Sequence, residues 1–320
     1  MPEELRLAPA EPVRAANGVE WVPVPGWKRI SWLWHGFSTR RGGVSRAYIS
    51  EGEPGDHPNE QELLVGGHGE LNLGFTADDT RENVLRNREL LAEAITGNLK
   101  TPLVMLRQIH SSVVMVADGA GFGQPCKGDG LMTDTPGMLT GVQTADCIPV
   151  LVADRKRKAV AAFHAGWRGT VKRIVESGIG RMRLQFGSEP EDLVAAIGPG
   201  IGPCCYAVGE EVLSEFGSQF AYAPELFHEV YGSDPVKDKY PLLFLAQRAP
   251  GRSLIGPNLH LDVAEANRRQ LLDAGLNAAN IRMVGGCTNC QPQLFFSHRG
   301  SHGRAGRMLS VIGIRGYSDS

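Results

Sequence analysis

The sequence lacks several features that mark whole classes of protein. No apolar run approaches the ~18 residues of a membrane-spanning helix, so we expect no membrane partner. The N-terminal segment carries early acidic residues and no apolar stretch, so we expect that it is not a secretory signal. Neither charge dominates, since 33 Lys and Arg stand against 35 Asp and Glu. This balance argues against nucleic acid as a main partner.

Cysteine is scarce as well. Six cysteines in 320 residues are too few for a disulfide scaffold. A reducing cytoplasm is therefore the expected location, where cysteine more often serves metal binding or catalysis.

Glycine, in contrast, is in excess, with 40 among 320 residues, against about 7% in ordinary proteins. The glycines show no three-residue period, which excludes collagen. Apolar segments run throughout and net charge is low, which excludes disorder. We therefore expect the surplus in loops. Much of it should line one pocket beside His110, Cys147 and His164, where the backbone comes close to a ligand.

The chain is expected to form one catalytic domain over residues 31–320, after an extended lead-in over residues 1–30. Two irregular segments interrupt the domain and look like insertions, a polar, glycine-rich one near 48–70 and a proline-rich one near 231–258. The domain is expected to be a monomer or a small homo-oligomer.

Three segments have the pattern of helices. Thr80 can cap one helix. Asp262 and Glu265 resemble a capping box at the start of another, which Gly275 would end. A third follows Thr170, where apolar residues and one glycine recur at helical spacing: Val171, Ile174, Val175, Gly178 and Met182.

Short β-rich runs lie between these helices, at residues 103–106, 112–116, 138–142, 148–153, 159–163, 193–197 and 309–314. Short turns join neighbouring runs, which favours antiparallel pairing, while the helices interleave irregularly. The fold class expected is therefore mixed α+β rather than a doubly wound parallel sheet.

The segment TADCIPVLVADRKRKAVAAFHAGWRGT contains two apolar runs around a polar turn. If they form a hairpin with Arg155-Lys156 as a two-residue loop, Cys147 lies directly opposite His164. Opposed side chains on one face have Cβ atoms about 4.5–5.5 Å apart, which suits a thiolate and an imidazole sharing one metal or one proton. Arg-Lys is, however, not a favoured two-residue loop.

A third donor is available upstream in His110, which follows a strand-like run. His110, Cys147 and His164 supply N, S and N donors, a set compatible with zinc and with copper. The alternative is that each histidine is an ordinary surface or core residue.

Glycine-bearing loops carry further candidates. Arg168 lies in a loop that leads into a helix, where free N–H groups and a guanidinium favour an anion such as phosphate. Arg40 and Asp129 lie in two similar loops. Each loop could also be a plain turn.

The remaining cysteines are open to more than one interpretation. Cys287 and Cys290 form a lone CxxC, either half of a zinc site or a redox pair. No second CxxC exists, although Cys204 and Cys205 could contribute in space. The simplest interpretation is that all four are core or loop cysteines, with a second metal site as the alternative.

Taken together, these segments resemble the YfiH family, also called the multicopper-polyphenol-oxidase or laccase-domain family. The resemblance runs from about residue 30 to 315 and rests on a series of motifs in one order: FSTRRGGVS, LRQIH, GDGLMTDTPG, TADCIPVL, HAGWRGT, IGPGIGPCCYAVGEEV, CTNC, FFSHRG and GRAGRMLSVIGI.

The resemblance implies a β-sandwich-like α+β core flanked by helices, related to toxin deamidase domains that use a Cys–His pair. It implies zinc bound by His110, Cys147 and His164. It also implies phosphorolysis of adenosine, inosine, guanosine and methylthioadenosine, and deamination of adenosine. Purine nucleoside and phosphate would then be the small-molecule partners.

Roles for single residues follow as hypotheses. Arg40 or Arg168 would hold phosphate, and Asp129 or Asp146 would act as general acid. Asp146 adjoins Cys147, so it could instead orient a neighbouring group. Two other functions stay open. One is a Cys147/His164 hydrolase or an editing factor for peptidoglycan precursors, and the other is a copper phenol oxidase, for which three ligands are too few to build a multicopper cluster.

Overall fold

The structure is a computed structural model that describes residues 8–49, 69–118, 126–230 and 258–316. Nearly all of the two predicted insertions, 48–70 and 231–258, lies outside the described residues. Within the described ranges, no helix has the length and apolar character needed to cross a membrane.

One six-stranded sheet contains both ends of the described chain. Its strands, in spatial order, are β1 (Val13–Arg14), β2 (Glu20–Val22), β3 (Leu33–Ser38), β17 (Met308–Ile314), β9 (Met138–Thr144) and β6 (Leu103–Met105). Neighbours pair antiparallel except β6, which runs parallel to β9. The predicted lead-in thus contributes the edge strand β1 and its neighbour β2, and its separation from the domain stays a prediction.

A second six-stranded sheet carries the segments with the chemistry-bearing residues. Its order is β16 (Ile281–Met283), β12 (Leu193–Ile197), β10 (Ile148–Asp154), β11 (Val160–Ala165), β8 (Gly130–Thr133) and β7 (Val114–Val116). β16 runs parallel to β12 and β7 runs parallel to β8, whereas the central pairs are antiparallel. Each predicted β-rich run overlaps one of the strands in these two sheets.

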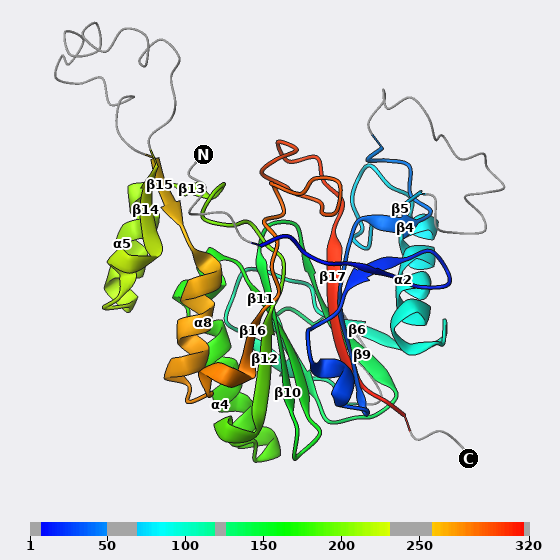
Figure 1. Ribbon diagram of the computed structural model, residues 1–320, viewed down its shortest axis with the longest axis horizontal. Helices are drawn as coiled ribbons and strands as arrows, with labels where there is room; N and C mark the ends of the chain where they lie inside the picture. The colour runs from blue at the N-terminus through cyan, green and yellow to red at the C-terminus, as the bar shows by residue number, and fades with distance from the viewer. Residues whose placement is uncertain (1–7, 50–68, 119–125, 231–257, 317–320) are drawn as a thin grey trace, which may run out of the picture.

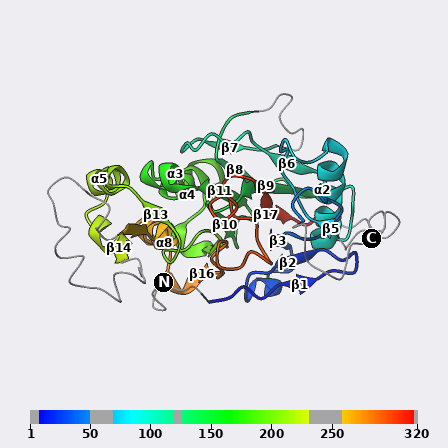
Figure 2. The same cartoon turned by 90° about the horizontal axis from the view of Figure 1, so that it is seen from above.

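The two sheets pack face to face with helices on the outside (Figures 1 and 2). In β10, Leu151 and Ala153 belong to the apolar cluster between the sheets, whereas Val150 and Val152 belong to the cluster under the helices. Because both faces of β10 are buried, its sequence is a continuous apolar run. This layered arrangement confirms the predicted α+β class.

Two of the three predicted helices begin directly after the capping residues that the sequence indicated. Helix α2 (Arg81–Thr96) covers the first sheet, and Thr80 accepts a hydrogen bond from the Asn83 amide. Helix α8 (Val263–Asp273) covers the second sheet, and Asp262 accepts from the Glu265 amide. The prediction of the third segment as one continuous helix is wrong. This segment divides into α3 (Trp167–Val171) and α4 (Ile174–Phe186), since Arg173 adopts a left-handed conformation, φ 57°, between them.

The remaining elements are small. A three-stranded sheet at one end of the molecule packs beside helix α5 (Figure 1). These elements are β13 (Ala207–Val208), β15 (Asn258–Leu261), β14 (Phe227–Val230) and α5 (Glu210–Gln219). The others are the pair β4 (Arg41–Gly43) and β5 (Gly69–Glu70) and the short helices η2 (Trp27–Arg29), η3 (Pro190–Asp192), η4 (Ala223–Leu226) and η5 (Ala278–Asn280).

Candidate metal centre

The hairpin β10–β11 places Cys147 and His164 at one end of the second sheet. Pro149, not Cys147, lies directly opposite His164, so the predicted register is wrong by two residues. The reason is the turn, which has four residues rather than two. The Asp154 carboxylate accepts the amides of Lys156 and Arg157, both at 2.8 Å, and Lys158 adopts φ 54°.

An error of two residues leaves the side-chain faces unchanged, because side chains alternate with a period of two along a strand. Cys147 therefore lies diagonally across from His164 on the same face. Their ligand atoms and that of His110 all lie within 4.8 Å of one another. The three side chains singled out from the sequence thus meet in space.

His110 reaches this cluster from the loop between β6 and β7. Its Nε2 lies 3.9 Å from the Cys147 Sγ, and its ring centroid lies 4.9 Å from that of His164. The backbone of His110 is left-handed, with φ 56°. Such a conformation is costly for a residue other than glycine and persists only where the surroundings enforce it.

Asp129 holds the backbone of His110 in this left-handed conformation. Its buried carboxylate accepts the backbone amides of Ile109, His110 and Ser111 at 2.6–3.2 Å. It also lies 2.9 Å from the His164 Nδ1, and since the carboxylate only accepts, this nitrogen carries the proton. The Nε2 of His164 is then the nitrogen available as a ligand.

The electrostatics agree with this positioning role for Asp129. Burial alone would raise the pKa of Asp129, but hydrogen bonds from His164 and Ser111 outweigh it and hold that pKa well below its usual range. A carboxylate that stays ionised cannot donate a proton as a general acid at neutral pH. The geometry favours orientation of His110 and His164 over the acid role suggested from the sequence.

Cys147 and His164 stabilise each other's charges. Burial would raise the pKa of Cys147, but the neighbouring His164 and His110 lower it to about 6. Burial would lower the pKa of His164, but Cys147 and Asp129 raise it to about 9. The thiol of Cys147 is therefore poised as a thiolate, the form that binds metals and attacks electrophiles.

The donor set fits a metal ion. A tetrahedral ion with bonds of about 2.3 Å to sulfur and 2.0–2.1 Å to nitrogen separates these donors by about 3.6 Å, close to the observed 3.9 Å between Cys147 and His110. Three protein ligands leave one position open, as in catalytic metal sites. The same set suits zinc and copper.

Gly166 is the glycine that the site requires. A Cβ there would lie 2.8 Å from the Cys147 Sγ and 3.2 Å from the His110 Cδ2. The wider prediction that the glycine surplus lines one pocket is wrong. A Cβ at Gly43 would instead strike the carbonyl of Glu70, and one at Gly198 would strike the ring of Phe37. Gly43 and Gly198 therefore allow close packing away from the donor group.

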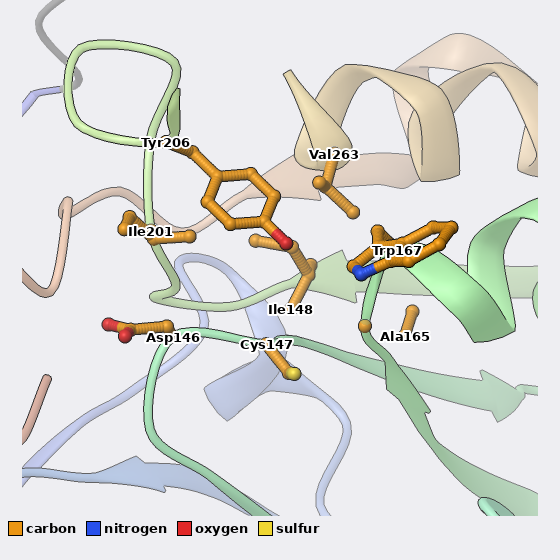
Figure 3. A pocket seen from close by; sticks show the side chains of 9 residues that line it. Asp146, Cys147, Ile148, Ala165, Trp167, Ile201, Tyr206 and Val263 are labelled. Atoms are coloured by element: carbon orange, nitrogen blue, oxygen red, sulfur yellow. The ribbon is translucent and has the colours of Figure 1, made fainter. Parts of the chain in front are cut away.

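A small pocket opens beside Cys147 (Figure 3). The rings of Trp167 and Tyr206 stand over it, and the Tyr206 hydroxyl points toward the side on which Cys147 lies. The other lining residues are Asp146, Ile148, Ala165, Gly166, Ile201 and Val263. Flat aromatic walls with few polar groups suit a planar ligand.

Asp146 adopts φ 93° and directs its carboxylate away from the Cys147 sulfur (Figure 3). Its Oδ1 accepts the Thr288 hydroxyl and its Oδ2 accepts the Arg299 amide, both at 2.7 Å. These contacts hold the chain next to Cys147, which favours the positioning role for Asp146 over the acid role.

The two predicted phosphate-binding arginines lie in different places. Arg168 follows Trp167 and stacks on its ring with the guanidinium 4.5 Å from the centroid. Within the described ranges no carboxylate forms an ion pair with Arg168. Arg40 is instead engaged by Glu70 and by the carbonyls of Tyr48 and Pro292, and it does not line the pocket.

Trp167, Tyr206 and Arg299 were not identified as site residues from the sequence. Arg299 places its guanidinium 5.4 Å from the centre of the Tyr206 ring. Burial is the main reason that the pKa of Tyr206 rises to about 12, so its hydroxyl keeps its proton at neutral pH. All three residues lie within or beside the glycine-bearing motifs, which was the available signal.

The chain is similar to known proteins along most of its length. Residues 34–315 match the family described as multi-copper polyphenol oxidoreductase laccase. A purine nucleoside phosphorylase of Deinococcus radiodurans is 35% identical over 280 residues, which cover 88% of each chain. The purine nucleoside phosphorylase YlmD of Geobacillus stearothermophilus is 34% identical over 253 residues, 77% of this chain and 84% of the relative. The crystal structure of YlmD from Geobacillus stearothermophilus superposes with a TM-score of 0.71 at 30% identity, covering 96% of this chain and all of that one.

Proposed function

The chain belongs to the multi-copper polyphenol oxidoreductase laccase family, and we propose that it is a zinc-dependent enzyme that cleaves purine nucleosides with phosphate. The relatives named purine nucleoside phosphorylase support this reaction type. The observation that carries the proposal is the convergence of His110, Cys147 and His164 beside an aromatic pocket.

In this reaction an oxygen of phosphate bonds to the ribose C1′, and the bond from C1′ to the purine nitrogen breaks. The electron pair of that bond leaves with the base, and positive charge builds on the sugar in the transition state, as in glycoside cleavage. The enzyme must therefore hold an anion on one side of the sugar and stabilise a departing base on the other.

The residues of the chain divide these tasks. Arg168, exposed beside Trp167, would hold the phosphate as a bidentate donor. Trp167 and Tyr206 would stack on the purine, and the protonated Tyr206 hydroxyl would donate a hydrogen bond to it. Asp129 would hold His110 and His164 in place. A zinc ion bound by His110, Cys147 and His164 would supply Lewis acidity.

The test is a turnover panel with adenosine, inosine, guanosine and methylthioadenosine, each with and without phosphate, on enzyme of known metal content. We expect the free base and the sugar 1-phosphate to appear only with phosphate, and Cys147→Ala to abolish the reaction. The sugar product is ribose 1-phosphate, or 5-methylthioribose 1-phosphate when methylthioadenosine is the substrate. Cys126→Ala is the matched control, since Cys126 does not belong to the group formed by His110, Cys147 and His164. Wild-type turnover by Cys147→Ala would refute the proposed site.

The open position of the same site also supports deamination of adenosine, in which water replaces the amino group at C6. This activity would release ammonia without consuming phosphate, so the phosphate-free arm of the panel measures it directly. The reducing cytoplasm is where we place both reactions, because the Cys147 thiol must stay reduced to bind an ion or to react.

A second candidate is a metal-free Cys147/His164 hydrolase or peptidoglycan-precursor editing factor. The mutual stabilisation of thiolate and imidazolium favours it, because that pairing activates a nucleophile. Iodoacetamide labelling of metal-depleted protein distinguishes this hydrolase from the metal-dependent phosphorylase. Hydrolysis that survives metal removal but not labelling of Cys147 would support the hydrolase over the phosphorylase.

Phenol oxidation by copper, which the family description names, is supported less well. Among the described residues, only His110, Cys147 and His164 form a donor group that contains histidine. A multicopper cluster needs more ligands than these three.

A further inference from the structure

Four cysteines from two distant segments meet in a second cluster. Cys204 and Cys205 follow β12, and Cys287 and Cys290 follow β16. β12 and β16 are parallel neighbours, so both strands end at the same edge of the sheet. A bridge between Gly200 and Cys287 continues the pairing beyond the strands. This four-cysteine cluster is therefore a consequence of the sheet topology.

The distances suit one ion held by four sulfurs. All four Sγ atoms lie within 4.8 Å of one another. The Cys290 Sγ lies 3.5 Å from that of Cys204 and 3.4 Å from that of Cys205. A tetrahedral zinc ion with Zn–S bonds of about 2.3 Å holds sulfurs about 3.8 Å apart. A polynuclear iron–sulfur cluster would spread its cysteines more widely than a single ion does.

The surroundings match a structural metal site. Cys204 and Cys287 are buried, with 3% and 2% of their surface exposed, whereas Cys290 lies at the surface. The Gly202 amide donates to the Cys287 Sγ at 3.3 Å. Backbone donors of this kind stabilise sulfur that carries negative charge and orient it toward a metal. No disulfide joins any of the six cysteines, all of which lie among the described residues.

We propose that Cys204, Cys205, Cys287 and Cys290 bind one Zn²⁺ as a closed four-sulfur site, separate from the His110–Cys147–His164 group. Four protein ligands fill a tetrahedral ion, so this site keeps no open position for substrate. Its role is structural, and the thiols release their protons when the ion binds.

The ion would brace one wall of the pocket. The segment after β12 carries Tyr206, which immediately follows Cys205. The segment after β16 carries Thr288 and Arg299, whose hydrogen bonds hold Asp146 beside Cys147. Joining the two segments through four sulfurs fixes the aromatic wall and the Cys147 backbone relative to each other.

The experiment is metal analysis of the full chain, loaded with Zn²⁺ alone and freed of excess by gel filtration. We expect two zinc ions per chain in the wild type, one in the double variant Cys287→Ser/Cys290→Ser and one in Cys147→Ser. Cys126→Ser is the matched control and should keep both. If the wild type shows no nucleoside turnover but holds the ion that depends on Cys287 and Cys290, the result counts only against the proposed catalytic function.

Cobalt substitution supplies a readout that does not depend on activity. Four thiolates give Co²⁺ intense near-ultraviolet sulfur-to-metal absorption. Most of this band should therefore persist in Cys147→Ser, whereas most of it should be lost in the double variant. If the double variant does not fold, a titration of the wild-type protein still tests the proposal. A mercurial reagent titrated against a chromogenic zinc indicator should release one zinc ion for four protected thiols.

The proposal is overturned if the double variant binds as much zinc as the wild type. It is also overturned if freshly purified wild-type protein holds no zinc that the mercurial releases from these cysteines. A mass two hydrogens lower than the reduced chain, without that zinc, would assign the cluster to a disulfide instead.

Discussion

The His164 Nδ1 lies 2.9 Å from the Asp129 Oδ1, and both side chains are buried. The same carboxylate accepts the His110 amide, so one aspartate orients two of the three donors at the candidate metal centre. Carboxylate–histidine pairs of this kind fix the tautomer and raise the basicity of the ligating nitrogen. Four predictions test this centre and the fold around it.

Asp129→Asn should weaken zinc binding roughly 10- to 100-fold, the usual effect of removing a partner of a metal-bound histidine. The amide keeps the shape of the side chain but loses the charge that favours a proton on the His164 Nδ1. Zinc affinity is measured by competition with a chelator of known affinity. Asp134→Asn, at an exposed position, is the control. Unchanged affinity in Asp129→Asn would contradict the positioning role.

Gly166→Ala should remove zinc and activity while the chain stays folded. The added Cβ would lie 2.8 Å from the Cys147 Sγ, so the sulfur must move out of the donor triangle. Gly180→Ala is the control, because Gly180 lies exposed in α4 with nothing within 4 Å of an added Cβ. That substitution should instead stabilise the helix by about 0.5–1 kcal/mol. Zinc content and thermal unfolding measure both effects.

Arg168→Ala should raise the KM for phosphate at least roughly tenfold, the size of a lost charge-assisted contact of about 1.4 kcal/mol or more. The KM for nucleoside should change little, because stacking on Trp167 and Tyr206 remains. Steady-state kinetics with each substrate varied in turn separate the two constants. Arg181→Ala, on the exposed side of α4, should match the wild type. A change in the KM for nucleoside alone would mean that phosphate does not bind at Arg168.

His35 should make the fold sensitive to acid. Burial lowers the pKa of His35 to about 4, and its ring lies edge-on to Trp21 and Trp27. Because the folded pKa is below the unfolded value of about 6.5, the stability is fully present above pH 6.5. It decreases as the pH falls toward 4, by about 2 kcal/mol between pH 7 and 5.

Urea unfolding of the wild type and of His35→Phe at both pH values measures this loss. The phenylalanine variant should lose less stability on acidification, since it has no group to protonate at that position. His298→Gln, which changes an exposed histidine, should lose as much as the wild type. Equal acid sensitivity in His35→Phe and the wild type would exclude His35 as the cause.

The sequence by itself determined the features that depend on neighbours along the chain. Thr80 and Asp262 start helices because each accepts an amide three residues further on, a contact that needs no tertiary partner. Apolar runs predicted the strands, because strands buried on both faces exclude polar side chains. The motifs also indicated His110, Cys147 and His164 together.

Only the tertiary structure decided how distant segments meet. The register of β10 and β11 depends on the left-handed Lys158 and on the hydrogen bonds of Asp154, which the composition of the turn does not specify. Asp129 contacts both His110 and His164 because β8, which follows it, pairs with β11. The four cysteines converge because β12 and β16 lie parallel, although more than eighty residues of sequence separate the two strands. Pairings of this kind depend on the whole packed core, and so no local pattern encodes them.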